Sequence, residues 1–252
     1  MKIQYPPIEA SRHFYTKIAN HVLELKAYFK DKDFDDIYYS QFEWFRGELP
    51  CTDKVLSLGC GYGREAFALM WNMKAVEAIG IDIDYKRVEH ATKRSQDIRE
   101  FSEIMQQALA EIDSGQFRAW CESVPTELID CIIPRFSQGD ISDNLVESTS
   151  RPDGYFDLVY CCNVLYFIAD ESRDKLYLAL QNIARTVKAE TGRIVIVEPT
   201  IKNGTQYDFR TYFEQVGLTL AKEPPEHEGR LGYLKMPGTK PMGYILKRKV
   251  SE

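Results

Sequence analysis

The sequence predicts an α/β fold, with a mostly parallel β-sheet and helices on both of its faces. Three observations carry this prediction. Short apolar runs of the kind that form buried parallel strands occupy residues 54–58, 78–82, 156–160 and 193–197. Helical patterns lie between them, such as residues 176–187, where apolar side chains recur every three or four positions. Glycines follow the first run at once, and strands that alternate with helices favour a parallel sheet.

The chain divides into three zones. Residues 1–50 carry apolar side chains at helical spacing and then a cluster of aromatic residues, which predicts helices and a lid over a substrate pocket. Residues 51–250 hold the α/β domain. Within it, residues 97–135 are long for a crossover between neighbouring strands, so we expect a helical insertion there.

The third zone begins at about residue 206. We expect a helix that Gly217 ends, a strand at residues 218–220 and a closing antiparallel strand at residues 242–247. Two aspartates are expected to cap helices elsewhere in the chain: Asp84 after the second apolar run, and Asp170 before the helix at residues 176–187.

Composition excludes some classes of function. The chain has 252 residues and a formal net charge of −6, which disfavours nucleic-acid binding through phosphate neutralisation. No apolar run approaches the ~20 residues of a membrane helix. The six cysteines include no CxxC pair, so the sequence supports no zinc site. We expect a cytoplasmic protein with reduced thiols, no membrane partner and no metal; the oligomeric state is not indicated.

The strongest motif spans residues 55–65. A strand ends, Gly59, Gly61 and Gly63 follow, and a helix begins at about Arg64. Glycines let the backbone approach a ligand, and the first turn of the helix offers free N–H groups. The spacing is GxGxG, whereas the dinucleotide motif would need glycine in place of Arg64, which disfavours NAD and FAD. Asp82 ends the next strand, where a carboxylate can accept hydrogen bonds from both ribose hydroxyls.

From residue 53 to about residue 246, the chain resembles the class I S-adenosylmethionine-dependent methyltransferases. The resemblance rests on residues 55–63, 80–84, 138–141, 156–165 and 192–197, in the order of the family's motifs. It implies a Rossmann-like three-layer fold with a seven-stranded, mostly parallel sheet whose last strand is antiparallel. It also implies S-adenosyl-L-methionine as cofactor and S-adenosyl-L-homocysteine as product.

The same resemblance implies a set of cofactor-binding residues. Asp140 would contact the adenine amino group, and Ile141 would pack on the ring. Ser57 stands where the family usually has Asp or Glu, and a hydroxyl accepts a hydrogen bond but adds no counter-charge. The full set is Ser57, Gly59, Cys60, Gly61, Gly63, Asp82, Ile83, Asp140, Ile141, Cys161 and Asn163.

The main functional hypothesis is methyl transfer to a small-molecule acceptor, by an in-line displacement in which the protein aligns the acceptor and excludes water. No residue pair indicates a general base. Asn163 is expected near the methyl group, and Glu198, after the fifth strand, is a candidate acceptor-site residue. Residues 156–176 also resemble methyltransferases that esterify protein glutamates in chemotaxis receptors. A protein or peptide acceptor is therefore one alternative, and a domain that binds cofactor or a protein partner without catalysis is another.

Overall fold

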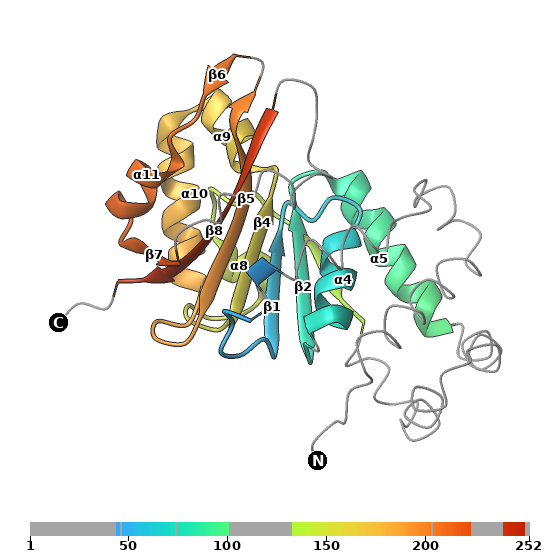
Figure 1. Ribbon diagram of the computed structural model, residues 1–252. Helices are drawn as coiled ribbons and strands as arrows, with labels where there is room; N and C mark the ends of the chain where they lie inside the picture. Colours follow the sequence, from blue (N-terminus) through green and yellow to red (C-terminus); the bar gives the residue numbers. More distant parts are fainter. Residues whose placement is uncertain are drawn as a thin grey trace.

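The computed structural model describes residues 44–45, 47–73, 75–100, 133–202, 204–222 and 239–249. These residues form a twisted sheet with helices packed against both faces (Figure 1). The predicted lid over residues 1–50 and the predicted insertion over residues 97–135 fall largely outside the described residues. Of the latter, residues 97–100 belong to a helix and Arg135 opens a strand.

The sheet confirms the predicted architecture. Its strand order is β3-β2-β1-β4-β5-β8-β7, and the first five strands in that order are parallel. The last strand in the sequence, β8, runs antiparallel to both of its neighbours, β5 and β7. The bounds of these strands are β1 Lys54–Leu58, β2 Glu77–Asp82, β3 Arg135–Gln138, β4 Leu158–Cys162, β5 Arg193–Lys202, β7 Leu218–Lys222 and β8 Thr239–Arg248.

Two features of the sheet differ from the sequence prediction. Strand β5 continues past residue 197 to Lys202, and a short strand, β6 (Thr205–Gln206), folds back and pairs with that extension. Strand β4 begins at Leu158 and not at residue 156. Just before it, the carboxylate of Asp157 accepts a hydrogen bond from the Lys54 N–H, at the start of the neighbouring strand β1. The β5 extension raises a hairpin above the carboxyl edge of the sheet (Figure 1).

Helices cover the two faces of the sheet. One face packs on α8 to α11 through an apolar cluster that joins Leu56 and Ile196 to Leu180 and Phe209. On the other face, Phe67 of α4 meets Phe136 of β3, with ring centroids 5.7 Å apart. The bounds are α4 Arg64–Met73, α5 Tyr85–Glu100, α8 Leu145–Thr149, α9 Leu165–Glu171, α10 Arg173–Thr186 and α11 Phe209–Gln215. None of these described helices has the length and apolar character needed to cross a membrane.

The helix ends test three predictions. Asp84 caps α5 as expected, since its carboxylate accepts a hydrogen bond from the Lys86 N–H at 2.9 Å. Gly217 follows α11 with φ 74°, a conformation that glycine adopts without strain. The prediction for Asp170 is wrong. A separate short helix, α9, contains Asp170, and Ser172 caps α10 instead by accepting from the Lys175 N–H.

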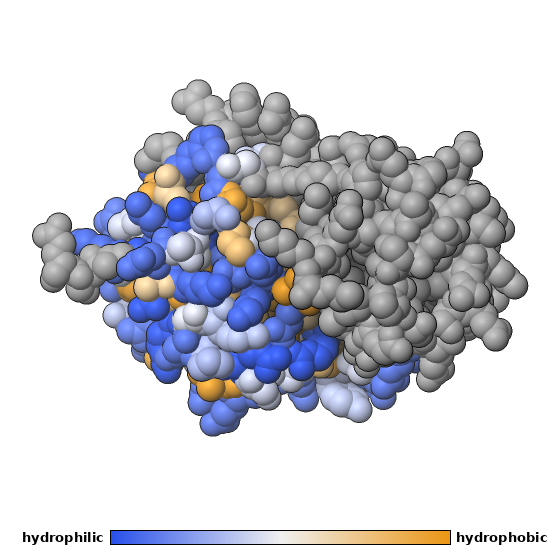
Figure 2. Space-filling view, turned by 90° about the horizontal axis from the view of Figure 1, so that it is seen from below, coloured by the Kyte–Doolittle hydropathy of each residue, from blue (hydrophilic) through white to orange (hydrophobic). Residues whose placement is uncertain are grey.

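The two edges of the parallel strands differ in what they present. Viewed from the amino edge, the described surface is largely hydrophilic, and its hydrophobic residues are scattered (Figure 2). Scattered hydrophobic residues are ordinary on a protein surface and indicate no binding site. At the carboxyl edge, the strands end in glycines, acidic residues and Asn163. In open α/β sheets, ligands bind at this edge.

Candidate functional site

A cavity of about 380 Å³ opens at the carboxyl ends of β1 to β4. Here it is called the strand-end cavity. Six residues of the predicted cofactor site line it together: Gly59, Asp82, Ile83, Asp140, Ile141 and Asn163. They come from four different strand ends, separated by up to about a hundred positions in the sequence, so the fold gathers what the sequence presents as separate motifs.

The three glycines of the loop have different roles. All three have positive φ values, between 54° and 89°, which favour glycine. A Cβ on Gly59 would lie 2.1 Å from Val164 Cγ2, and one on Gly63 would lie 2.6 Å from Phe136 Cζ, so both positions serve close packing. At Gly61, no atom of the described residues lies within 4 Å of the corresponding point. Gly61 is therefore the glycine at which the structure leaves open space for a ligand.

Asp82 holds the glycine loop in place. Its side chain is 5% exposed. One carboxylate oxygen accepts the Gly61 N–H at 2.7 Å, and the other accepts the Asp84 N–H at 2.9 Å. Each oxygen keeps a second lone pair, and Asp82 also lines the strand-end cavity. The carboxylate can thus accept two further hydrogen bonds, which suits the vicinal diol of a ribose.

The loop after β3 supplies a second acceptor. Asp140 Oδ1 accepts hydrogen bonds from the Ser142 N–H at 2.8 Å and the Ser142 hydroxyl at 2.7 Å. Its other oxygen has no hydrogen bond among the described residues, and Asp140 lines the cavity. Ile141, which is buried, and Ile83, which is 65% exposed, line the same cavity. A free carboxylate oxygen near apolar side chains suits a flat ring that carries an amino group.

The exit of β4 is fixed by a buried carboxylate. Asn163 has φ 57°, uncommon for a residue other than glycine, and its N–H donates to Val197 O at 2.9 Å. Glu198, fully buried on β5, accepts hydrogen bonds from the first backbone N–H groups of the α9 turn: Val164 at 2.7 Å, Leu165 at 2.8 Å and Tyr166 at 3.4 Å. The carboxylate thereby caps α9 from a neighbouring strand.

The prediction that Glu198 is an acceptor-site residue at the rim is therefore wrong. Strand β5 continues past this position, and the side chain turns under the N-terminus of α9, where its oxygens are used by backbone amides. Its effect on the site is indirect. It fixes α9, whose residues Phe167, Ile168 and Glu171 line the strand-end cavity.

Three predicted site residues are buried behind the cavity lining. Cys161 belongs to the apolar core, and Cys60 lies against Gly80. Burial raises the pKa of both thiols well above the usual value, so they behave as small apolar side chains. Ser57, 1% exposed, has a hydroxyl without a hydrogen-bond partner in the described part of the chain. Gly61 and Gly63 also lie outside the lining set, although Gly61 is tied to Asp82.

Several lining residues escaped the sequence prediction. They follow the β4 exit at helical spacing, from Val164 through Phe167 and Ile168 to Glu171 and Lys175, the last two joined as an ion pair. Arg87 of α5 lies opposite. The signal that could have found the residues up to Glu171 is the three-to-four-residue period after Asn163, which places them on one face of α9; Lys175 belongs to the next helix, α10.

The sequence of this chain matches a known protein family. The model of the CheR methyltransferase SAM-binding domain matches residues 52–196, more than half of the chain. No match was found among curated proteins.

Solved structures with a similar fold cover nearly the whole chain. An S-adenosylmethionine-dependent methyltransferase from Clostridium acetobutylicum has a TM-score of 0.55 at 14% identity, over 94% of this chain and 99% of its own. Magnesium protoporphyrin IX methyltransferase from Synechocystis, solved with bound S-adenosylmethionine, has a TM-score of 0.51 at 14% identity, over 93% and 96%. The cyclase SpnF has a TM-score of 0.53 at 14% identity, over 84% and 82%. The fold is thus the Rossmann-like methyltransferase fold.

Proposed function

This chain belongs to the CheR methyltransferase family and uses S-adenosylmethionine, and on that premise we propose that it methylates a carboxylate of a small molecule. The observation that carries the proposal is the strand-end cavity, which brings six predicted cofactor-site residues together. The carboxylate acceptor is inferred from the hydrogen bonds, ion pairs and pKa values of the ionisable groups at that cavity.

The residues present fit the cofactor. Asp82 would accept the ribose hydroxyls, and the free oxygen of Asp140 would accept the adenine amino group. Ile83 and Ile141 would contact the adenine ring. The open space at Gly61 would admit the part of the cofactor that crosses the glycine loop, and the unpartnered hydroxyl of Ser57 lies just behind that loop.

Among the described residues, each carboxylate that lines the cavity makes a hydrogen bond or an ion pair, and the proposed cofactor contacts use the remaining acceptors of Asp82 and Asp140. Asp82 accepts two backbone N–H groups, Asp84 caps α5, Asp140 accepts from Ser142, and Glu171 pairs with Lys175. The nearby thiols of Cys60 and Cys161 are buried, and their pKa values are raised. An acceptor that first had to lose a proton would need a base. A carboxylate acceptor does not, because it is already ionised at neutral pH.

S-adenosylmethionine supplies a methyl group on a positively charged sulfur. Transfer to a carboxylate would form an O–CH₃ bond as the S–CH₃ bond broke and its electron pair stayed on sulfur, so the chain would not have to remove a proton. The chain's own work is alignment and exclusion of water. Asn163, held by Val197, and α9, held by Glu198, supply a rigid wall for this purpose.

A protein carboxylate is the second candidate acceptor. It is favoured by the segment 156–176, which resembles methyltransferases that esterify protein glutamates and overlaps the range matched by the family model. A domain that binds cofactor without catalysis is a third candidate. It is supported by Ser57, which stands where the family usually has an acidic residue.

The test has two stages. Calorimetric titration of the full chain with S-adenosylmethionine, S-adenosylhomocysteine and NAD should show micromolar binding of the first two alone. Methyl-labelled cofactor should then label a small molecule in a metabolite extract, and mild base should release the label as volatile methanol, which is diagnostic of a methyl ester. An Asp153→Ala variant, altered at an exposed ion pair outside the cavity, serves as the control.

Each outcome selects one candidate. Base-stable label would show a nitrogen, carbon, sulfur or hydroxyl-oxygen acceptor and would refute the carboxylate proposal. Label in protein rather than in the small-molecule fraction would favour the second candidate. Binding of both sulfur nucleosides without any transfer would favour the domain that binds cofactor without catalysis.

A further inference from the structure

A second cavity, of about 630 Å³, lies between the α9–α10 junction, β6 and the first turn of α11. Here it is called the hairpin cavity. No residue lines both cavities, and α9 contributes to each: Phe167 and Glu171 to the strand-end cavity, Ala169 and Asp170 to the hairpin cavity. The volume is in the range of small-molecule sites.

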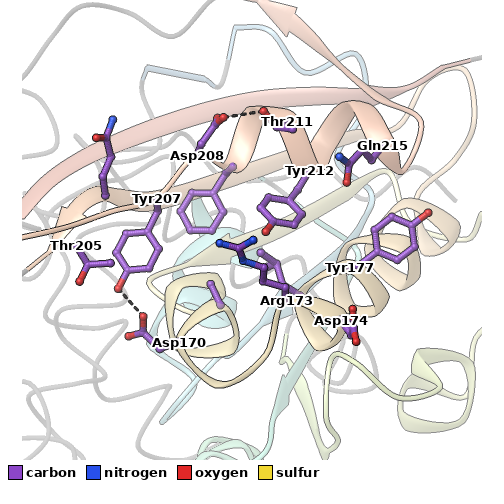
Figure 3. Close-up of a pocket in the computed structure, with 14 residues that line it drawn as sticks. Asp170, Arg173, Asp174, Tyr177, Thr205, Tyr207, Asp208, Thr211, Tyr212 and Gln215 are labelled. Atoms are coloured by element: carbon purple, nitrogen blue, oxygen red, sulfur yellow. Dashed lines mark hydrogen bonds between the residues drawn. The ribbon is translucent and has the colours of Figure 1, made fainter.

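One wall of the hairpin cavity is aromatic. Tyr207 and Phe209 stack with ring centroids 5.8 Å apart and planes 5° from parallel. Tyr212, from the next turn of α11, lines the same cavity (Figure 3). Flat aromatic surfaces of this kind bind flat apolar groups by contact and by ring stacking.

A cation projects into this space. Arg173 lies at the first position of α10, and in Figure 3 its guanidinium reaches into the cavity between Tyr207 and Tyr212. No hydrogen bond or ion pair is made by Arg173 within the described part of the chain. A guanidinium matches a carboxylate through paired N–H donors, so an unpaired one in a cavity is suited to an anionic group of a ligand.

Carboxylates surround the same space. Asp170 accepts the Tyr207 hydroxyl at 2.7 Å, Asp208 accepts the Thr211 hydroxyl at 2.6 Å, and Asp174 is also in the lining. Each of the first two bonds occupies one carboxylate oxygen and leaves the other for a ligand. Burial and the bond to Asp170 raise the pKa of Tyr207 to about 12, which keeps its hydroxyl a donor.

We propose that the hairpin cavity binds a zwitterion with an aromatic side chain, of the class of the aromatic amino acids. Its carboxylate pairs with Arg173, its ammonium group with Asp170, and its ring lies on Tyr207 and Tyr212. A purely anionic ligand would meet three carboxylates, and a purely cationic one would leave Arg173 without a partner. The site goes beyond the proposed methyl transfer, because it shares no lining residue with the strand-end cavity.

Three probes with one phenyl ring separate the possibilities: L-phenylalanine, phenethylamine without the carboxylate, and hydrocinnamate without the ammonium group. Calorimetric or NMR titration of the full chain should show L-phenylalanine binding at least about tenfold more tightly than either of the others, since each lost charged hydrogen bond costs on that scale. The Arg173→Gln variant should lose about tenfold for L-phenylalanine and little for phenethylamine.

Arg185→Gln is the matched control. Arg185 lies on the last turn of α10, where it pairs with Asp153 on the surface at 2.9 Å, outside the cavity, so its removal should leave all three affinities unchanged. Far-ultraviolet circular dichroism and thermal melting check that each variant is folded.

Two results would overturn the proposal. In one, L-phenylalanine binds no more tightly than both fragments, or does not bind at all; in the other, Arg173→Gln binds it as tightly as the wild type. Tight binding of phenethylamine alone would identify a cation site instead. S-adenosylmethionine titrated into the same samples reports on the strand-end cavity separately, so that failure here is distinguishable from failure of the proposed function.

Discussion

The two halves of the carboxyl edge are built in different ways. On the nucleoside side, around β1 and β2, the key contacts join neighbouring motifs: Asp82 accepts from Gly61 and from Asp84, which is two residues away. On the β4 exit side, the key contact joins Val164 to Glu198, 34 residues apart and on different elements. On both sides a buried carboxylate holds the turn after a neighbouring strand, but Asp82 accepts from two backbone N–H groups and one of them is local, whereas Glu198 accepts from three that are all distant in sequence.

The difference predicts which side is the more sensitive to a single change. Glu198→Ala would leave three backbone N–H groups of α9 buried without their acceptor, and the expected cost is about 3 kcal/mol or more of folding free energy. Urea unfolding would measure it. Glu198→Gln keeps one acceptor oxygen, so its cost in folding free energy should be smaller than that of Glu198→Ala. Glu190→Ala, at an exposed site before β5, is the control; equal stability of all three variants would contradict the capping role.

This contrast also explains which features were predictable. The GxGxG spacing and the bond from Asp84 to Asp82 act over a few residues of sequence, and Asp82, 21 residues from Gly61, ends a strand whose apolar pattern shows where it lies. Glu198 was misplaced at the rim because nothing in its local sequence shows that β5 continues beyond it or that α9 begins beside it. Strand β3 has the same difficulty: three of its four residues, RFSQ, are polar, and its identity depends on pairing with β2.

The glycine loop offers a comparison within the nucleoside side. Gly59→Ala places a methyl group 2.1 Å from Val164 Cγ2 at φ 61°, and we expect a loss of ~2–4 kcal/mol of stability from the clash and the backbone strain. Gly61→Ala meets no atom of the described part of the chain within 4 Å, so only ~1 kcal/mol of backbone strain is expected. Urea unfolding of both variants measures the difference.

Affinity for the cofactor should show the opposite order, with the larger loss in Gly61→Ala. If the space at Gly61 receives the cofactor, Gly61→Ala should lose most of its affinity for S-adenosylmethionine while it remains folded. The double variant Gly59→Ala, Val164→Ala removes the clashing methyl group and should recover part of the stability lost at Gly59. A Gly61→Ala variant that binds as tightly as the wild type would exclude this glycine from the site.

On the nucleoside side, Asp82 both holds the glycine loop and lines the strand-end cavity. Asp82→Asn keeps the shape of the side chain but replaces one acceptor oxygen with a donor, which faces either the Gly61 N–H or the Asp84 N–H. We expect a loss of ~1–3 kcal/mol in cofactor binding, measured by calorimetry. Asp153→Asn, on an exposed pair, should change nothing. Unchanged affinity in Asp82→Asn would mean that the carboxylate holds the loop but does not touch the ribose.

Ser57 gives the smallest expected effect and the sharpest distinction between a structural role and a binding role. Its buried hydroxyl has no partner in the described part of the chain, and an unsatisfied buried hydroxyl is a cost to the folded state. Ser57→Ala should therefore leave stability unchanged or raise it by up to ~1 kcal/mol. If the hydroxyl binds the methionine end of the cofactor, the same variant should lose about threefold to tenfold in cofactor affinity. That loss corresponds to the free energy of one hydrogen bond. Stability that rises while affinity falls would show that the site, and not the fold, requires this serine; affinity equal to that of the wild type would remove Ser57 from the cofactor site.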